Sequence, residues 1–180
     1  CSLGSINLSR FVKGEDLDWP ELARVVHEAV LFLDNIVEIN EFPVAKIREM
    51  VNKTRRIGLG VMGFADMLFK LEVRYDSEAG VVWAEKVMKF INDEARMATV
   101  ELGIKRGVFP VWEESVYGGT EYRPRNMALT TIAPTGTISV VADASSGVEP
   151  LFSLGYQKNM VEGKTLYVMN PVFIEELKKR

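Results

Sequence analysis

The chain has 180 residues, which suits a single domain, and 47% of them are hydrophobic, which is enough to build a core. No window approaches the roughly 18 uninterrupted apolar residues of a membrane span, so we expect no membrane partner. The formal net charge is −3 with both signs interspersed, and no basic stripe marks a nucleic-acid polymer as a partner. With one cysteine and one histidine, the chain can form neither a four-ligand structural zinc site nor an intrachain disulfide.

The chain is predicted to open with a strand and a long helix. Residues 3–8 form a short apolar run that predicts the strand. The helix follows because Asp18 and Glu21 fit a capping box, Pro20 lies in the first turn, and apolar residues recur at helical spacing. The apolar stripe consists of Leu22, Val25, Val26, Ala29, Val30, Leu33, Ile36 and Val37.

Two further helices are predicted over residues 43–52 and 54–71. In the second, the segment GLGVMG (residues 58–63) matches the dinucleotide-binding fingerprint letter for letter. Arg55 and Arg56, however, stand where that fingerprint needs the end of a hydrophobic strand. Close packing of this helix against a neighbouring backbone is the simpler explanation of its glycines.

Two titratable residues on these helices are candidates for chemistry. His27 lies opposite the apolar stripe, beside Arg24, Glu28 and Asp34. A general base needs an aligned partner, which the sequence does not show, so we expect a solvated or surface-paired histidine. Asp66 lies inside the helix predicted over residues 54–71, and we expect it to be a capped or paired structural carboxylate rather than a catalytic one.

The second half of the chain begins with another long helix. Asp76 or Ser77 caps its start, and it ends near Arg106, before Gly107, which is a common signal for a helix C-terminus. Residues 113–125 are polar and rich in glycine and tyrosine, which is typical of a surface loop. The predicted buried side of the helix consists of Ala84, Val87, Met88, Ile91, Ala95, Ala98 and Leu102.

The C-terminal part is predicted to contain short strands and a last helix. Residues 151–154 and 165–169 are expected to be strands on either side of a turn that contains Gly163, and Pro171 opens the helix. Strands that alternate with helices predict an α/β architecture with some parallel pairing.

The segment with the clearest chemistry is TIAPTGTISVVADASSGVEP, residues 131–150. An apolar run over residues 128–132 predicts a strand that ends in a proline turn and leads into a short helix. Backbone N–H groups at such a helix start are free, and the helix dipole favours an anion there. No lysine or arginine lies in this segment, so a phosphate would be held by amides and hydroxyls, unlike in a Walker A loop.

We expect the anion site at residues 134–139, called here the proline–glycine turn. Pro134 directs the chain out of the strand, and Gly136 lets the backbone approach the anion closely. An ordinary strand–turn–helix junction with a threonine cap is the alternative. The candidate phosphate-binding residues are Pro134, Thr135, Gly136, Thr137, Ile138 and Ser139.

This segment resembles the phosphate-binding segment of the large, catalytic subunit of ribonucleotide reductases, and most of all the class II, adenosylcobalamin-dependent branch. APTGTIS followed at this spacing by SSGVEP carries the resemblance. Other segments fit the same family in the same order along the chain. They are CSLGSINL, TRRIGLGVMGFADMLF, RNMALTTIAPTGTIS and NPVF.

The resemblance implies that residues 1–180 are a single fragment of the catalytic barrel domain, incomplete at both ends. The family fold is a ten-stranded α/β barrel of the ribonucleotide reductase and glycyl-radical enzyme type. The family reduces the ribose of ribonucleoside di- or triphosphates by thiyl-radical chemistry, and a cysteine pair supplies the electrons and becomes a disulfide. Cys1 matches one member of that redox pair. The radical cysteine and its asparagine and glutamate helpers have no counterpart here, so the chain alone is expected to be inactive.

The resemblance also implies partners and a cofactor. We expect a ribonucleotide substrate, a thioredoxin- or glutaredoxin-like reductant, the remainder of the reductase polypeptide and a homodimer partner. Adenosylcobalamin is expected in the full enzyme, although no motif in this chain binds it. A cytoplasmic location is expected, and one lone cysteine suits a reducing compartment.

Alternatives remain open at this stage. The chain could be a nucleotide-binding α/β module without catalysis, or a fragment of a Rossmann-type dehydrogenase built on residues 58–63. Cys1 could be a buried, inert cysteine. A cysteine at the first position would also fit a segment that follows an intein.

Overall fold

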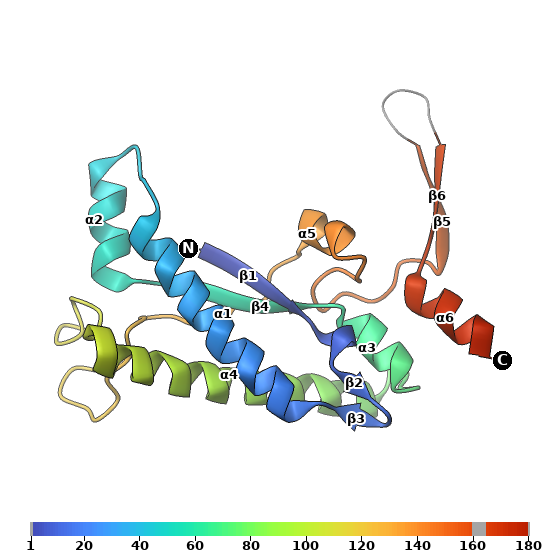
Figure 1. The fold of residues 1–180 in the computed structure, drawn as a ribbon, viewed down its shortest axis with the longest axis horizontal. Coiled ribbons are helices and arrows are strands. Elements are labelled where there is room, and N and C mark those ends of the chain that lie inside the picture. Colours follow the sequence, from blue (N-terminus) through green and yellow to red (C-terminus); the bar gives the residue numbers. More distant parts are fainter. Residues whose placement is uncertain (1, 160–164, 180) are drawn as a thin grey trace.

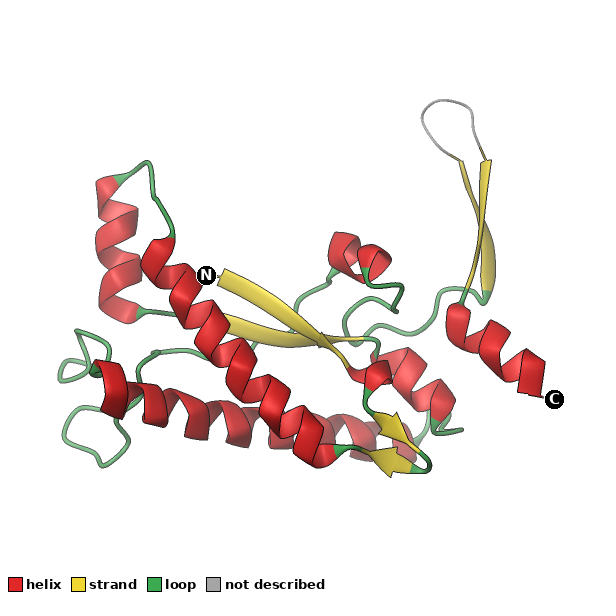
Figure 2. Cartoon of the chain, viewed as in Figure 1, coloured by secondary structure: helices red, strands yellow, loops and turns green. Residues whose placement is uncertain are grey.

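The computed structural model describes residues 2–159 and 165–179 (Figure 1). Over these residues it is a mixed structure of helices and three two-stranded sheets, shown by type in Figure 2. The α/β character predicted from the sequence is confirmed, and a closed barrel is not formed by these residues. No helix within the described ranges is both long and apolar enough to cross a membrane.

Two long helices form the main layer of the structure. The predicted helix after Asp18 is α1 (Trp19–Ile39), and the Asp18 side chain accepts a hydrogen bond from Glu21 N, as the capping box requires. The predicted helix after Ser77 is α4 (Glu78–Arg106), capped by the Ser77 hydroxyl. The two helices pack against each other, and together with apolar residues of the segment 57–68 their apolar stripes make the core. Its fully buried members include Leu22, Val26, Val30, Val87, Ile91 and Ala95.

A pair of parallel strands lies against α1. The strand β1 (Ser2–Asn7) pairs with β4 (Ile57–Met62), with Ser2 opposite Ile57 and Asn7 opposite Met62. All six residues of β4 are buried. After β1, the chain makes a short 3₁₀ helix and a small hairpin before α1 begins. Their bounds are Leu8–Arg10 for η1, Val12–Lys13 for β2 and Asp16–Leu17 for β3.

The prediction of a helix over residues 54–71 is wrong. The first part of this segment is the strand β4, and only Phe64–Lys70 forms a helix, α3. The glycines explain the difference, because a Cβ at Gly58 would lie 2.6 Å from a methyl group of Leu3, and one at Gly60 would lie 2.8 Å from Thr131 O. Close packing against a neighbouring backbone therefore does explain these glycines, but they lie in a strand and not in a helix. Glycines buried inside a strand also cannot hold a dinucleotide at a helix start, which removes the Rossmann alternative.

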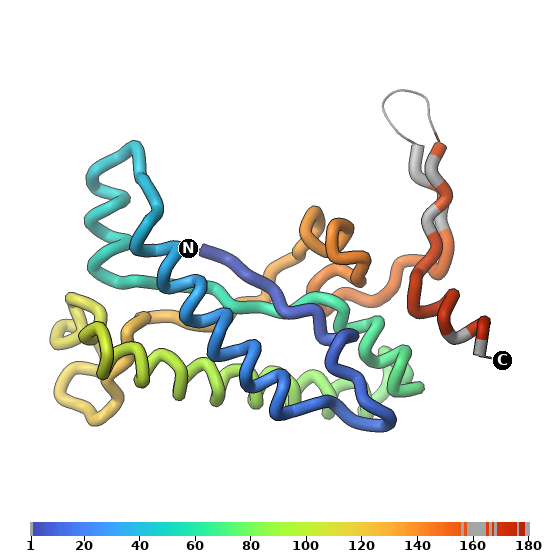
Figure 3. The backbone as a smooth tube through the Cα atoms, viewed as in Figure 1, coloured from blue at the N-terminus to red at the C-terminus, as the bar shows by residue number. Residues whose placement is uncertain are grey.

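A third segment runs beside β4, on the side away from β1. Ile57 N donates to Ala128 O, Leu59 N to Leu129 O, and Thr131 N to Leu59 O. The predicted strand at residues 128–132 is thus an extended segment joined to β4 by one isolated parallel bridge. Figure 3 shows its path: after α4 the chain forms loops at one end of the molecule and then returns along β4 to α5 (Gly136–Val141).

The C-terminal part contains an antiparallel hairpin and a helix. The strands are β5 (Gly155–Asn159) and β6 (Thr165–Met169), followed by α6 (Pro171–Lys179). The predicted strand at residues 151–154 is wrong, because this segment has no regular structure and pairing begins only at Gly155. The expected turn at Gly163 lies outside the described residues.

A buried ionic cluster joins the remaining helix to this framework. The helix α2 (Ala45–Thr54), predicted two residues earlier, ends at Arg55, which adopts a left-handed conformation with φ 46°. Arg55 is buried, and its Nε and Nη2 donate to Asp34 Oδ1 over 3.0 and 2.9 Å. Asp34 had been expected on the polar side of α1 beside His27, but its carboxylate is fully buried.

The same carboxylate also contacts donors at residues 106–126, which are 72 to 92 positions further along the chain. Asn126 Nδ2 donates to Asp34 Oδ1 over 2.9 Å, and Arg106 Nη1 donates to Asp34 Oδ2 over 3.2 Å. Arg125 Nε lies 3.6 Å from Asp34 Oδ2, and burial lowers the pKa of the Arg125 guanidinium. Asp34 therefore holds together α1, the end of α4 and the start of the segment that runs along β4.

The close approach of Gly60 to the Thr131 carbonyl can be tested by a substitution that adds one methyl group. Gly60→Ala should lower the free energy of unfolding by about 1–3 kcal/mol, because the added Cβ meets the Thr131 carbonyl at 2.8 Å. Gly4→Ala on the partner strand is the matched control, since its Cβ meets only ordinary contacts with Leu33 from 3.5 Å. Urea denaturation of both variants measures the difference, and equal stabilities would contradict the packing described here.

The buried cluster predicts a second effect on stability. Asp34→Asn should cost about 3 kcal/mol, because it leaves the buried Arg55 guanidinium without its carboxylate. Asp76→Asn, which breaks the exposed pair with Arg74, should leave stability essentially unchanged. Thermal and urea denaturation would compare the two, and a harmless Asp34→Asn would show that Glu38 alone suffices to pair Arg55.

Candidate functional site

The proline–glycine turn leads directly into α5. Thr135 is the N-cap residue and adopts a left-handed conformation, with φ 57° and ψ 25°. Its side chain does not cap the helix. The amides of Gly136, Thr137 and Ile138 are the first three of the helix, so they have no acceptor within it. These three residues are exposed, so the N–H groups that the helix leaves without an acceptor belong to a solvent-facing part of the chain.

Two of the three hydroxyls predicted at the site point inward. Thr135 and Ser139 are buried, and only Thr137 is exposed. The Thr135 hydroxyl accepts a hydrogen bond of 2.7 Å from Gly147 N, and the Ser139 hydroxyl lies 3.1 Å from that of Ser146. Both hydroxyls therefore brace the turn against residues 145–147, called here the serine loop.

Gly136 has free space around it. A Cβ added at this residue would meet no atom within 4 Å, and its φ is not in the left-handed region. The glycine is thus not required by the fold. The missing side chain leaves the backbone open to a close approach from outside, which is the property that an anion-binding turn needs.

The serine loop is held from behind by α3. Asp66, in the first turn of α3, is fully buried, and its Oδ2 accepts a hydrogen bond of 2.6 Å from Ser145 N. Its Oδ1 accepts one of 2.7 Å from Asn170 Nδ2. The prediction that Asp66 is paired is confirmed, since both of its carboxylate oxygens accept hydrogen bonds.

His27 is paired at the surface, as predicted. Its Nε2 lies 3.0 Å from Glu94 Oε2, between α1 and α4. This pair lies on helices that do not contribute to the turn. Among the described residues, no group of three His, Cys, Asp or Glu side chains could hold a metal ion.

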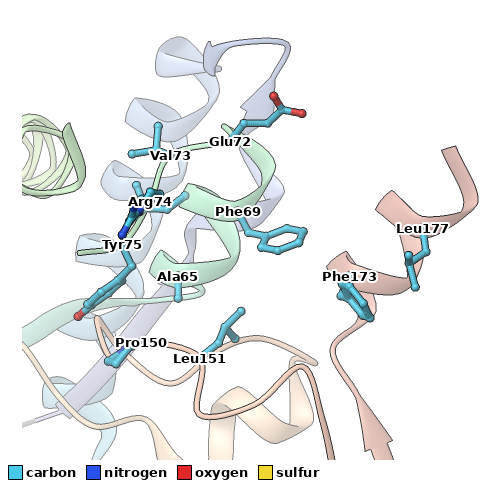
Figure 4. Close-up of a pocket in the computed structure, with 11 residues that line it drawn as sticks. Ala65, Phe69, Glu72, Val73, Arg74, Tyr75, Pro150, Leu151, Phe173 and Leu177 are labelled. Atoms are coloured by element: carbon cyan, nitrogen blue, oxygen red, sulfur yellow. The ribbon is translucent and has the colours of Figure 1, made fainter. Parts of the chain in front are cut away.

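A separate apolar pocket of about 550 Å³ lies between α3 and α6 (Figure 4). Phe69 and Phe173 face each other across it, with ring centroids 6.4 Å apart, and Leu151 lies beside them. Its lining is mostly apolar and includes no residue of the proline–glycine turn. We therefore do not assign it to an anionic ligand.

Cys1, the predicted redox thiol, lies outside the described residues, and its role stays a prediction. The next residue, Ser2, pairs with Ile57 at the start of β4. The role of the serine loop was missed in the sequence, although SSGVEP is part of the resemblance. The residues joined by its bonds to Asp66 and Thr135 are 79 and 12 positions apart in the sequence, and no local sequence pattern predicts such pairs.

Comparison with known proteins identifies the family. The family model for the barrel domain of ribonucleotide reductase matches residues 1–123 and 119–180. A vitamin B12-dependent ribonucleoside-diphosphate reductase of Thermoplasma acidophilum is 47% identical over 180 residues, covering 99% of this chain and 23% of that protein. A protein of the same description from Mycobacterium tuberculosis is 40% identical, covering 96% of this chain and 25% of its own length.

A more distant relative belongs to the same family of reductases. The ribonucleoside-diphosphate reductase subunit alpha of Chlamydia trachomatis is 31% identical, covering 99% of this chain and 20% of that subunit. The chain spans about a quarter or less of the curated relatives that it matches. Because the family model covers the whole chain in two overlapping matches, the chain belongs to the ribonucleotide reductase barrel-domain family.

Proposed function

We propose that this chain is part of the catalytic barrel of a ribonucleoside-diphosphate reductase and that its proline–glycine turn binds the phosphates of the substrate. The observation that carries the proposal is the start of α5, where Gly136, Thr137 and Ile138 are exposed and their amides have no acceptor within the helix. The named relatives, which act on ribonucleoside diphosphates, favour a diphosphate over the triphosphate that the sequence left open.

The turn is suited to grip the substrate away from the reacting sugar. Hydrogen bonds from neutral donors to a charged oxygen contribute about 1.5–3 kcal/mol each. Two or three amides would therefore anchor the nucleotide tail, while the exposed Thr137 hydroxyl can add another donor. The buried hydroxyls of Thr135 and Ser139 would contribute indirectly, by keeping the turn in its conformation.

Cys1 is proposed to supply reducing electrons. In the reduction, Cys1 and a second thiol from the remainder of the polypeptide would lose two electrons and two protons and form a disulfide. The ribose 2′-hydroxyl would leave as water, and a C–H bond would replace the C–O bond at that carbon. A thioredoxin- or glutaredoxin-like protein is proposed to reduce the disulfide again.

The cofactor is proposed to bind elsewhere in the protein. Adenosylcobalamin would supply the radical that starts the reaction, as the B12-dependent relatives suggest. The described residues offer no unpaired imidazole as an axial ligand for its cobalt, because His27 Nε2 is already paired with Glu94. No step in the reaction is therefore assigned to a contact between this chain and the cofactor.

The larger assembly is also part of the proposal. The parallel strands β1 and β4 and the segment beside them would form part of a ten-stranded barrel completed by the rest of the polypeptide. Residues 1–180 as one barrel fragment, a homodimer and a cytoplasmic location stay predictions from the resemblance.

Gly136→Val in the complete protein tests the phosphate site. The side chain should cover the exposed amides and weaken the binding of a ribonucleoside diphosphate at least about tenfold, equivalent to the loss of one charge-assisted bond. The fold should persist, because nothing lies within 4 Å of the new Cβ. Equilibrium binding measures the effect. The affinity for the corresponding nucleoside, which has no phosphate, should not change.

Val141→Ala, at the exposed far end of the same helix, is the control and should bind the diphosphate normally. An unchanged affinity in Gly136→Val would place the phosphates elsewhere and remove the proposal. Binding of the diphosphate without any reduction by the complete, reconstituted protein would favour a nucleotide-binding module instead.

A further inference from the structure

We propose that Asp66 is a positioning residue for the nucleotide: its buried carboxylate holds the serine loop, and the serine loop holds the proline–glycine turn at which the phosphates bind. This inference rests on the proposed function of the turn. If the inference is right, a change at Asp66 lowers the affinity for phosphate, although Asp66 touches no exposed part of the turn.

The first step is the attachment of Ser145 to α3. Asp66 Oδ2 accepts a hydrogen bond of 2.6 Å from Ser145 N, and Asp66 N donates to the Ser145 hydroxyl over 3.3 Å. A third bond joins Gly63 N to Ser145 O over 2.8 Å. One residue of the loop is thus tied at its amide, carbonyl and hydroxyl to the start of a single helix.

The second step leads from the serine loop to the turn. Gly147 N donates to the Thr135 hydroxyl over 2.7 Å, and the hydroxyls of Ser146 and Ser139 lie 3.1 Å apart. Gly147 has φ 48°, and a Cβ there would lie 2.7 Å from Ala133 O, so the loop packs directly on the backbone that enters the turn. The loop therefore supports the turn at both its first and its last hydroxyl.

The two bonds that Asp66 accepts require a carboxylate at this position. Asp66 must accept two hydrogen bonds on two different oxygens, one from Ser145 N and one from Asn170 Nδ2. An amide has only one such oxygen, so Asp66→Asn would set an N–H₂ group against one of these donors. Because Asp66 is fully buried, water cannot repair that conflict at low cost.

Asn170 offers a rescue by exchange. Its Oδ1 accepts a hydrogen bond of 2.9 Å from Phe173 N at the start of α6, and its Nδ2 donates to Asp66. In the double variant Asp66→Asn with Asn170→Asp, the amide oxygen at position 66 can accept from Ser145 N, and the amide group can donate to the new carboxylate. The second oxygen of that carboxylate can still cap α6, so every bond of the original arrangement has a counterpart.

The experiment compares four forms of the complete protein: the unchanged chain, each single variant and the exchange. The readout is the ratio of the affinities for a ribonucleoside diphosphate and for its nucleoside, together with the thermal midpoint. We expect Asp66→Asn to lower the ratio about tenfold, since a binding group displaced by a fraction of an ångström loses its geometry. The exchange should restore most of that ratio.

Two controls separate positioning from loss of stability. Val87→Ala removes methyl groups from a fully buried residue of α4 that makes no polar contact with the loop, so it should lower the thermal midpoint and leave the ratio unchanged. If Asp66→Asn behaves in the same way, Asp66 is only structural and the inference is wrong. If the exchange fails to restore the ratio in a folded protein, the hydrogen-bond path is wrong.

The outcome for Gly136→Val keeps this inference apart from the proposed function. If that variant leaves the affinity ratio unchanged, the turn does not bind the phosphates, and both ideas fail together. If it lowers the ratio while Asp66→Asn does not, the phosphate site stands and only the role of Asp66 is removed.

Discussion

The close approach of β4 to its two neighbours is the constraint on which the rest of the structure depends. Gly58 and Gly60 have no side chain to separate this buried strand from Leu3 of β1 and from Thr131 beyond it. Three backbone hydrogen bonds then fasten residues 128–131 along β4. The proline–glycine turn follows this segment directly. The position of the turn therefore depends on the absence of side chains at Gly58 and Gly60 of β4.

Polar groups complete what this backbone packing begins. Asp34 gathers Arg55, Arg106 and Asn126 at the start of the segment that runs along β4. Asp66 holds the serine loop beyond the end of that segment. Two buried carboxylates thus fix the two ends of one extended stretch, and the amides at Gly136 and Thr137 are left facing solvent between well-supported elements.

Local signals in the sequence predicted the helices well, because caps and apolar spacing act within one or two turns. The cap at Asp18, the stripe of α1 and the start of α4 at Ser77 are all confirmed. The strand β4 was mistaken for a helix, because its residues are buried on both sides and show no alternation of polar and apolar residues. Its glycines are needed because of close contacts with Leu3 and Thr131, which are distant in the sequence. At the site, the position of the turn could be predicted, but the inward direction of Thr135 and Ser139 could not. That direction depends on a loop whose own support comes from Asp66, far back in the chain.

The lack of lysine and arginine over residues 131–150 has a consequence for how the molecule would respond to ionic strength. A full positive charge attracts an anion over about 8–10 Å, and dissolved salt weakens that attraction. Peptide dipoles act over a shorter range than a full charge, although salt screens them as well. A nucleotide tail held at Gly136 and Thr137 would therefore gain little long-range attraction from the turn, and its affinity would fall less with added salt than the affinity of a site lined by lysine or arginine.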